Sequence, residues 1–457
     1  MSQHTLAVLD QVIKEGIALG VGHHVLEDTE LTGREMTLDG RRLVNFGSCS
    51  YLGLEKHPAL IEGTIDALRR FGTQFSSSRT YASLGLYAEL EAALSEMFGQ
   101  PTLVTASTTL GHLATLPVLV GDSDAVILDM QVHASVQMAT EVLRAQGVPV
   151  AVIRHNDMRA LERKVRDLSA THPKVWYLAD GIYSMYGDSA PLDALMDMLA
   201  RHERMHLYVD DAHGMSWAGV HGVGHVRSRI PHHPRMMLTV SLNKAFASAG
   251  GAMVFPDVES AQAVRNCGPT LMFSGPIQPP MLGAAVASAR LHLSAEITEL
   301  QARLARRVAF MNETLAAAGM PQLVKNDSPL FFVPAGTTTV NYTIMKRMFV
   351  DGFYLNSAVY PAVPMRRGGL RFTVTNHLSE ADIEAMVRSM SVHYRAVLKE
   401  HGLTMDDVHR TFRIPPVGVH PLASPAAVAA HPDTLQLGAR READAQLVQA
   451  PAVALPA

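Results

Sequence analysis

The sequence has few cysteines, little net charge and no long apolar run, and each of these shortages excludes a class of protein. Its two cysteines, Cys49 and Cys267, are too few for a disulfide framework or a cysteine-rich zinc site. The 457 residues carry 39 basic and 43 acidic side chains, and the net charge of −4 argues against a nucleic-acid coat or a polybasic membrane anchor. No apolar run approaches the ~20 residues that span a bilayer, and the acidic N-terminal residues do not suit a signal peptide. We therefore expect a cytoplasmic protein with no nucleic-acid partner, membrane span or resident metal.

Apolar residues make up 47% of the chain and charged residues 18%, which is typical of a folded protein with a large core. Short apolar runs alternate with helical stretches in the middle of the chain. They lie at residues 102–107, 124–130, 148–155, 174–180, 206–211, 236–241 and 251–256. These runs are rich in Val, Leu and Ile and lack strict polar alternation, as strands do when both faces of a mainly parallel sheet are covered. The predicted fold class is therefore α/β, with a ligand site at the carboxyl ends of the strands.

Changes in composition divide the chain into four segments. Residues 1–50 form an N-terminal segment that we expect to pack on a small domain, and residues 51–285 form a large, cofactor-binding domain. Residues 286–412 form a smaller α+β domain, because long Ala/Leu/Arg helices are followed by short strands and another helix. Residues 413–457 are rich in Pro and Ala without periodicity, which predicts a mobile tail.

Glycines predict several local boundaries ahead of the sheet. The pair Asp39-Gly40 predicts a hairpin turn, and two helical stretches end at Gly72 and Gly99, which suit the position after a helix. The two helices flank the polar connection 76–81. Such a connection can hold a ligand, and a solvated loop is the alternative.

Two chemically unusual segments follow the ends of predicted strands. Asp210 and Asp211 end one strand and His213 follows them. These groups are costly to bury unless they bind a cofactor or substrate, although they also suit the start of a helix. Lys244 follows the end of a later strand and precedes a run of small residues. Alone, this lysine fits a surface cation, but paired with Asp210 it predicts a Schiff-base lysine and an acid that keeps a pyridinium nitrogen protonated.

Ser107, Thr108 and Thr109 lie between a predicted strand and a helix. Free N–H groups and the positive end of the helix dipole favour a phosphate at such a place. Hydroxyls at a helix start are common, so this segment alone is a weak indication. The Asp210–Lys244 pair already implies a phosphate-bearing cofactor, and these three residues are its predicted phosphate site.

From Ser50 to Ile383, the order of motifs resembles that of the α-oxoamine synthase family of fold-type I pyridoxal 5′-phosphate (PLP) enzymes. The segments that carry the resemblance are residues 50–58, 127–135, 179–195, 209–214, 241–244, 273–280 and 368–383. The resemblance implies a large domain around a seven-stranded, mainly parallel sheet, a smaller C-terminal α+β domain, and PLP as the cofactor. It also implies a homodimer with shared active sites.

Matched position by position, the resemblance assigns roles to individual residues around the cofactor. Lys244 is expected to bind the cofactor aldehyde, Asp210 to pair with the pyridine nitrogen, and His133 to stack on the ring. Ser184 and His213 are expected near the phenolic oxygen, and His213 also suits the substrate carbonyl. For His133 the alternative is a satisfied core histidine, and for Ser184 it is a turn hydroxyl.

The resemblance also assigns residues to the phosphate and to the substrate carboxylate. Ser241 is expected to bind the phosphate, Ser274 to reach the phosphate of the neighbouring subunit, and Arg371 to hold the substrate carboxylate. His377 matches a family histidine close to this arginine. The alternatives are a turn hydroxyl for Ser274, a structural ion pair for Arg371 and a core position for His377.

Three positions depart from the family pattern. Cys49 replaces an asparagine that is usual beside the substrate, so Cys49 and the adjacent Ser50 are assigned to substrate binding. Tyr87 replaces a histidine in a loosely matched glycine-rich segment, and His112 replaces an asparagine after the phosphate-binding turn. We expect Cys49, Tyr87 and His112 to touch the substrate and acyl entrance rather than the cofactor linkage, which predicts an unusual amino acid or acyl donor.

The implied activity is that of a C-acyltransferase, which condenses an amino acid with an acyl thioester, loses carbon dioxide and gives an α-amino ketone in a biosynthetic pathway. Lys244 would remove the α-proton, and His213 would polarise the thioester carbonyl. A fold-type I aminotransferase or retro-aldol lyase shares Lys244 and Asp210 and is the alternative, and a non-catalytic partner subunit is a third possibility. The thioester is carried by CoA or by a carrier protein. Its phosphate would need a local basic cluster, for which the candidates are Arg69, Arg70 and Arg79, or Arg366 and Arg367.

Overall fold

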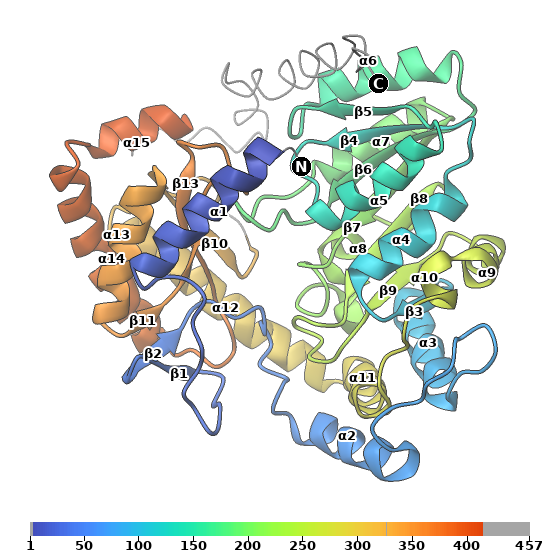
Figure 1. The fold of residues 1–457 in the computed structure, drawn as a ribbon, viewed down its shortest axis with the longest axis horizontal. Helices are drawn as coiled ribbons and strands as arrows, with labels where there is room; N and C mark the ends of the chain where they lie inside the picture. Colours follow the sequence, from blue (N-terminus) through green and yellow to red (C-terminus); the bar gives the residue numbers. More distant parts are fainter. Residues whose placement is uncertain (1–2, 326, 415–457) are drawn as a thin grey trace, which may run out of the picture.

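A seven-stranded sheet organises the larger part of the molecule in this computed structural model, which describes residues 3–325 and 327–414 (Figure 1). Along the sheet the strand order is β3-β9-β8-β7-β6-β4-β5. The strands are β3 (Thr102–Thr105), β4 (Ala125–Asp129), β5 (Val150–Ile153), β6 (Val175–Asp180), β7 (Met205–Asp210), β8 (Met236–Ser241) and β9 (Gly251–Val254). Strand β9 runs antiparallel to both of its neighbours and the other pairs are parallel. The predicted α/β class and the seven predicted strands are confirmed.

Helices cover both faces of this sheet because its side chains are apolar on both sides. In β6, Trp176 and Leu178 pack on one face, whereas Val175 and Tyr177 pack on the other. The first face is covered by α4 (Thr108–Leu119), α5 (Ala134–Ala145), α9 (Val258–Cys267) and α10 (Pro269–Met272). The second is covered by α3 (Gly85–Phe98), α6 (Met158–Ser169), α7 (Leu192–Arg201), α8 (Gly224–Arg229) and α11 (Pro279–His292).

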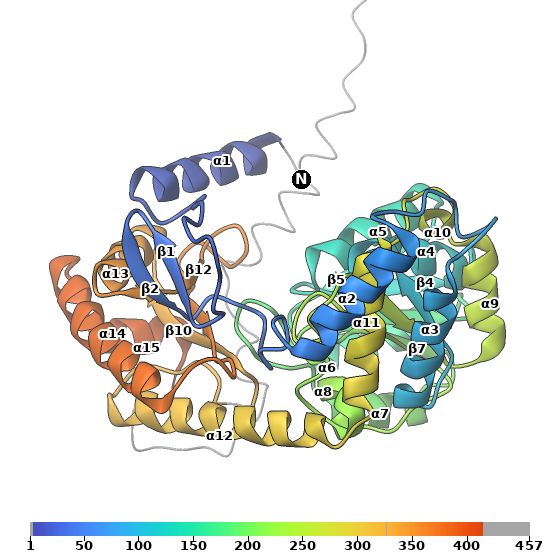
Figure 2. The same ribbon diagram turned by 90° about the horizontal axis from the view of Figure 1, so that it is seen from below.

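Helix α2 (Pro58–Phe71) lies against α11 (Figure 2). The two backbones approach closely because glycines face each other: a Cβ atom on Gly63 would stand 2.7 Å from the carbonyl oxygen of Gly283. The glycines that were predicted to end α2 and α3, Gly72 and Gly99, follow these helices with φ values of 76° and 65°. The expected domain boundary after residue 285 falls inside α11.

The C-terminal part is built on a second, antiparallel sheet with the order β10-β13-β12. Helix α12 (Glu296–Ala317) leads into it from the larger part, as Figure 2 shows. The other elements are β10 (Leu330–Gly336), α13 (Thr338–Val350), β11 (Phe353–Tyr354), β12 (Asn356–Ala358), β13 (Gly368–Thr373), α14 (Glu380–Glu400) and α15 (Met405–Phe412). In the part of the chain that the structure describes, no helix is both long and apolar enough to cross a bilayer. The predicted tail lies outside the described residues from residue 415 onward.

The N-terminal segment adds a helix and a hairpin to this C-terminal part (Figure 1). Helix α1 (Gln3–Ala18) precedes β1 (Glu35–Leu38) and β2 (Arg41–Asn45), which pair as an antiparallel hairpin. The predicted turn residues Asp39 and Gly40 have φ values of 49° and 68°, as a tight hairpin turn requires. Strand β2 then pairs in parallel with β11, so residues from both ends of the described chain share one sheet.

Candidate active site

Lys244 lies in the short connection between β8 and β9, at the edge where the parallel strands end. This connection is closed by hydrogen bonds: Leu242 N–H donates to the carbonyl oxygen of Gly250 at 3.0 Å, and Gly250 N–H donates to Asn243 Oδ1 at 2.7 Å. Gly250 has a φ of 113°, and a Cβ atom there would stand 2.8 Å from the carbonyl oxygen of Thr105. These contacts hold the backbone of the connection in place, so Lys244 projects from a rigid turn.

Asp210 ends the neighbouring strand β7 and is buried. Its Oδ2 atom lies 3.0 Å from Nε2 of His112, and its Oδ1 atom accepts the N–H of Ala212 at 3.0 Å. Burial opposes ionisation of Asp210, but the hydrogen bond from His112 and the nearby charge of Lys244 outweigh it and hold the pKa of Asp210 below its usual range. Asp210 is therefore a buried carboxylate beside the lysine, as the sequence predicts.

Asp180 was not singled out from the sequence, although it ends β6 directly beside Asp210 in the sheet register. Its Oδ1 atom accepts the backbone N–H of His133 at 3.0 Å. Burial and then the charge of Asp210 raise the pKa of Asp180 well above its ordinary value. The pKa values of these two adjacent carboxyls are therefore shifted in opposite directions.

Asp211 points away from this pair and is enclosed by glycines. A Cβ atom on Gly181, Gly214 or Gly224 would overlap its carboxyl oxygens, and its Oδ2 atom accepts the N–H of Val226 at 2.9 Å. Burial raises the pKa of Asp211 well above its ordinary value. We read Asp211 as a structural cross-link between strand β7 and helix α8.

His213 is buried and hydrogen-bonded to a residue from the N-terminal segment. Its Nδ1 atom lies 2.8 Å from the phenolic oxygen of Tyr51. Burial lowers the pKa of His213 well below its ordinary value, and the charges of Lys244 and Arg371 add to this effect. A neutral imidazole beside two cations suits the predicted role of His213 near the substrate carbonyl. Tyr51 was missed in the sequence because nothing links it to a residue 162 positions away.

Arg371 reaches this group of residues from strand β13 of the C-terminal part. It is buried, and its Nε atom donates to the carbonyl oxygen of Ser184 at 2.6 Å. Within the described residues, no carboxylate forms an ion pair with its guanidinium group. A buried cation without an anionic partner is costly, so this group is suited to bind a carboxylate from a ligand.

Cys49 lies among the same charged groups. Burial raises the pKa of Tyr51 well above its ordinary value, and the thiol of Cys49 adds to this rise. The thiol also acts electrostatically on Lys244. Cys49 is thus close to the lysine, and its contact with the substrate stays a prediction. Ser50 is half-buried next to it, with its N–H donating to Ser48 Oγ at 3.1 Å.

His133 caps the start of helix α5 and faces the same charges. Its Nδ1 atom lies 2.7 Å from Ser135 Oγ, and its ring experiences the charges of Asp210 and Lys244. The side chain is exposed although the strand ends around it are buried. An exposed imidazole in this position suits the predicted stacking role.

The predicted phosphate site lies at the start of α4. Ser107 is the N-cap, and its Oγ atom accepts the N–H of Leu110 at 3.2 Å. The N–H groups of Thr108 and Thr109 have no acceptor among the described residues, as expected for the first turn of a helix. Ser241 is buried at the end of β8, and its Oγ atom accepts the N–H of Asn243 at 3.2 Å.

The other predicted residues lie apart from this cluster or have structural partners. Ser274 is half-buried in the segment between α10 and α11, beside the largely exposed Phe273. His377 packs against Gly53, and its Nε2 atom lies 2.8 Å from Glu55 Oε1, so it is a structural contact.

Tyr87 and His112 correct the sequence-based expectation that both touch the substrate entrance. Tyr87 is buried, and its phenolic oxygen accepts the N–H of Ile277 at 2.7 Å. His112 is fully buried behind Asp210 rather than at an entrance. The expectation was wrong because a motif position gives the distance along the chain but not the side of the sheet that the residue occupies.

One of the basic candidates for thioester phosphate binding is also excluded. Arg79 is buried against Tyr87, with its guanidinium carbon 3.8 Å from the ring centroid, and it forms an ion pair with Glu91 at 3.0 Å. Arg69, Arg70 and Arg366 are exposed.

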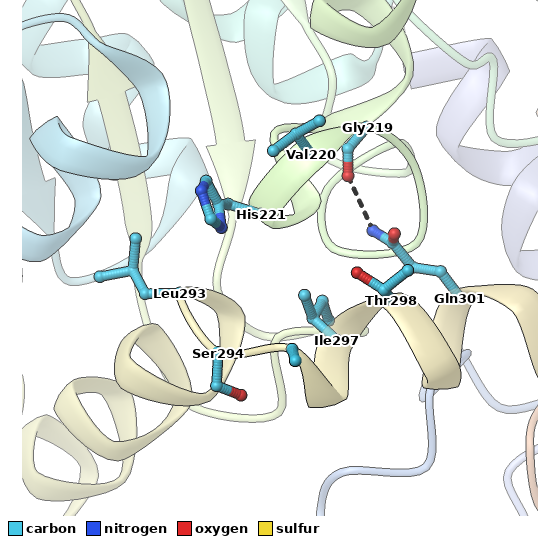
Figure 3. Close-up of a pocket in the computed structure, with 9 residues that line it drawn as sticks. Gly219, Val220, His221, Leu293, Ser294, Ile297, Thr298 and Gln301 are labelled. Carbon is cyan, nitrogen blue, oxygen red and sulfur yellow. Dashed lines mark hydrogen bonds between the residues drawn. The ribbon is translucent and has the colours of Figure 1, made fainter.

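A separate cavity of about 310 Å³ lies where the 3₁₀ turn η1 (Val220–Gly222) meets the junction of α11 and α12 (Figure 3). Gln301 spans it, and its Nε2 atom donates to the carbonyl oxygen of Gly219 at 3.0 Å. None of the predicted site residues lines this cavity. It is therefore distinct from the cluster around Lys244.

Comparison with known proteins places the chain in a family. A sequence profile of the aminotransferase class I and II family matches residues 41–390. The chain is 34% identical over 368 residues to 8-amino-7-oxononanoate synthase from Maricaulis maris, covering 80% of this chain and 90% of that protein. The chain belongs to the α-oxoamine synthase family. It is also 31% identical to serine palmitoyltransferase from Sphingobacterium spiritivorum, over 78% of this chain and 88% of that protein.

Solved structures agree on the fold of this α-oxoamine synthase family member. Serine palmitoyltransferase from S. paucimobilis superposes with a TM-score of 0.79 at 24% identity, covering 85% of this chain and 97% of that one. At this identity the similarity concerns the fold alone. The predicted fold-type I architecture and the predicted family are both confirmed.

The residues at the site fit PLP, the cofactor that family membership implies. Lys244 supplies an amine beside the buried carboxylate of Asp210, and helix α4 supplies unpaired N–H groups for a phosphate. Gly251 keeps this turn open, because a Cβ atom there would stand 2.6 Å from the nitrogen of Thr108. The exposed ring of His133 completes a set of donors that matches an aromatic aldehyde with a pyridine nitrogen and a phosphate.

Proposed function

We propose that this chain is a PLP-dependent acyltransferase that condenses an amino acid with an acyl thioester to give an α-amino ketone, carbon dioxide and a thiol. The observation that carries the proposal is the joint electrostatic environment of Lys244, which includes both the Asp210 carboxylate and the Arg371 guanidinium. Amino-acid chemistry on PLP requires an amine, a partner for the pyridine nitrogen and a group that binds the carboxylate. The names of the relatives support the choice of a synthase within this family.

When bound, PLP supplies an electron sink that stabilises negative charge at the α-carbon of an amino acid. We assign the groups that hold it by the chemistry of each donor. Lys244 takes the aldehyde, Asp210 the pyridine nitrogen, His133 the ring face and Ser184 the phenolic oxygen. The phosphate is assigned to Ser107, Thr108, Thr109 and Ser241.

The remaining groups act on the two substrates. Arg371 binds the amino-acid carboxylate through the guanidinium nitrogens that Ser184 leaves free, and Cys49 and Ser50 adjoin the same substrate. Removal from water lowers the pKa of Lys244, although the charge of Asp210 acts in the opposite direction. Its Nζ atom is therefore able to take the α-proton.

His213 is assigned to the thioester. If the Tyr51 hydroxyl donates to Nδ1, the proton of the neutral ring is on Nε2, which can then donate to the thioester carbonyl. A carbon–carbon bond forms from the α-carbon to the acyl carbon as the thiol leaves. The carboxylate then departs as carbon dioxide, and the α-carbon takes a proton, which Lys244 Nζ can return.

The absorption spectrum of protein reconstituted with PLP tests the cofactor assignment. We expect a visible band that is absent from Lys244→Ala and retained in Lys164→Ala, since Lys164 is an exposed lysine on α6. A band that persists in Lys244→Ala contradicts the proposal.

Thiol release from acyl-CoA and acyl-carrier substrates, scored over a panel of amino acids, then tests the reaction. An aminotransferase would form a keto acid from the amino acid without releasing thiol. A retro-aldol lyase would release an aldehyde, again without thiol. The synthase requires stoichiometric thiol and carbon dioxide, so either of the other outcomes overturns it.

We further propose a homodimer as the minimal unit, in which Ser274 contributes to the phosphate site of the neighbouring subunit. The support is the exposure of Phe273 beside it, a large apolar side chain that is 86% exposed in the single chain. Sedimentation of the purified protein tests this, and a monomer at assay concentration contradicts it. A cytoplasmic location stays a prediction.

A further inference from the structure

His112 bridges two side chains that lie on the same face of strand β7. Tyr208 and Asp210 are two positions apart, so they point to the same side of the sheet. Nδ1 of His112 lies 2.8 Å from the phenolic oxygen of Tyr208, and Nε2 lies 3.0 Å from Asp210 Oδ2. The imidazole is fully buried on α4, and both of its nitrogens are therefore used inside the protein.

The partners fix the direction of these hydrogen bonds. An ionised carboxylate only accepts, so Nε2 of His112 carries a proton and donates to Asp210. Burial, followed by the charge of Asp210, raises the pKa of Tyr208 well above its ordinary value, so its hydroxyl keeps its proton. The hydroxyl donates to Nδ1, and in this arrangement a neutral His112 satisfies all three groups.

The hydrogen bond from His112 to Asp210 matters because a second carboxyl, that of Asp180, lies next to Asp210. It lies beside Asp210 in the sheet register and receives the backbone N–H of His133 but no side-chain donor from His112. The groups that act on Asp210 are the cations or donors His112, Lys244 and His133, and the carboxyls Asp180 and Asp211. Two carboxyls this close do not both ionise, so one donor placed asymmetrically determines which of them holds the charge.

We propose that His112 is a positioning residue that places the negative charge on Asp210 rather than on Asp180. The Tyr208 hydroxyl holds the imidazole in the tautomer that donates to Asp210, and the proton shared by the two carboxyls is left on Asp180. This inference rests on the proposed function, because a bound pyridine nitrogen is what makes the location of the charge matter. Without His112 the charge would be shared with Asp180, and the contact to the pyridine nitrogen would weaken.

The test measures the dissociation constant of PLP for apoprotein in His112→Leu, with and without Asp180→Asn. We expect His112→Leu to weaken PLP binding by about tenfold. A change of one unit in the pKa of Asp210 corresponds to a factor of ten in the equilibrium between its charged and neutral forms. Adding Asp180→Asn should restore binding to within about threefold of the wild type, because the charge then has only Asp210 to occupy. His112→Asn is the matched variant, since its amide retains an N–H donor, and it should bind PLP nearly as well as the wild type.

Each outcome decides the inference. Unchanged PLP binding by folded His112→Leu overturns it, and so does weakened binding that Asp180→Asn fails to restore, which would indicate a purely structural role. If His112→Leu does not fold, infrared spectra of wild-type and Asp180→Asn apoprotein decide instead. A carboxylic-acid C=O band should disappear in Asp180→Asn, and its full retention overturns the inference. A wild type that binds no PLP refutes the proposed function, whereas the infrared result is independent of the cofactor.

Discussion

His155 is buried between two carboxylates, and its replacement tests how much a buried charge cluster contributes to this fold. Its Nδ1 atom lies 2.9 Å from Asp129 Oδ1, its Nε2 atom lies 2.6 Å from Asp188 Oδ2, and its side chain is 4% exposed. Burial alone would lower the pKa of His155, but the charges of Asp188 and Asp129 and the hydrogen bonds to them raise it to about 10. The cluster joins the ends of β4 and β5 to the turn that carries Ser184, the acceptor of Arg371.

Two estimates give the size of the effect. A rise from 6.5 to about 10 corresponds to roughly 5 kcal/mol of preferential stabilisation of the charged form. Removing one partner of a buried ion pair costs about 3–5 kcal/mol, because the charge left behind has no compensation. We therefore expect His155→Gln to lower the free energy of unfolding by about 3–5 kcal/mol at pH 7.

The pH dependence has a definite sign. A histidine whose pKa is raised in the folded state stabilises fully below its unfolded pKa of 6.5, and this contribution is lost as the pH rises through about 10. The difference between wild type and His155→Gln should therefore shrink between pH 7 and pH 10. Urea unfolding of apoprotein at both pH values measures it.

A matched control is His393→Gln. His393 also pairs with an aspartate, Asp351, at 2.9 Å, but its side chain is 21% exposed and that of Asp351 is 40% exposed. This surface pair should contribute about 1 kcal/mol or less. If His155→Gln costs no more than His393→Gln, or if its cost is the same at pH 7 and pH 10, the reasoning is refuted.

Two further predictions concern packing in the larger part of the molecule. Gly283→Ala should destabilise by about 1–3 kcal/mol despite the better helix propensity of alanine, because the added Cβ would overlap the carbonyl oxygen of Gly63 across α2 and α11. Gly85→Ala, at the start of α3 where nothing lies within 4 Å, is the control for Gly283→Ala in the same thermal melts and should not destabilise. Arg79→Met should cost about 3 kcal/mol in urea unfolding, since it leaves Glu91, whose side chain is only 12% exposed, without one of its cations; a loss below about 1 kcal/mol would contradict this.

Short, uninterrupted apolar runs made the central sheet predictable from sequence. Apart from the edge strand β5, where Val152 is exposed, its strands are buried on both faces, so the apolar residues are contiguous and the runs stand out from the flanking helices. The C-terminal part was predicted less completely. Short strands were expected there, but β11 and β12 have only two and three residues and no pattern that marks them. Helix α13 was missed because its two faces differ little in polarity: it buries Asn341 along with Val340 and Tyr342.

The site was predicted where one motif carries both the residue and its chemistry. Lys244 and Asp210 each follow a strand end, and parallel strand ends meet at one edge, so their proximity follows from the topology. The contacts of His112 and Tyr51 do not follow from any local pattern. His112 meets Asp210 across 98 positions, and the meeting depends on the face of the sheet that α4 covers. Asp180 ends a predicted strand, but only the sheet register shows that it lies beside Asp210.

The pairing of β2 with β11 has a consequence for synthesis of the chain on the ribosome. Val44 pairs with Phe353, so strand β2 leaves the ribosome about 300 residues before its partner exists. At roughly 5–20 residues per second this delay amounts to about 15–60 seconds, during which the hairpin presents an unpaired edge. Tyr51 and Cys49 follow that hairpin directly, and they cannot pack near Arg371 until strand β13, which carries it, has also left the ribosome. The site is thus assembled late in translation, after the strands that carry Asp210 and Lys244 have had time to fold.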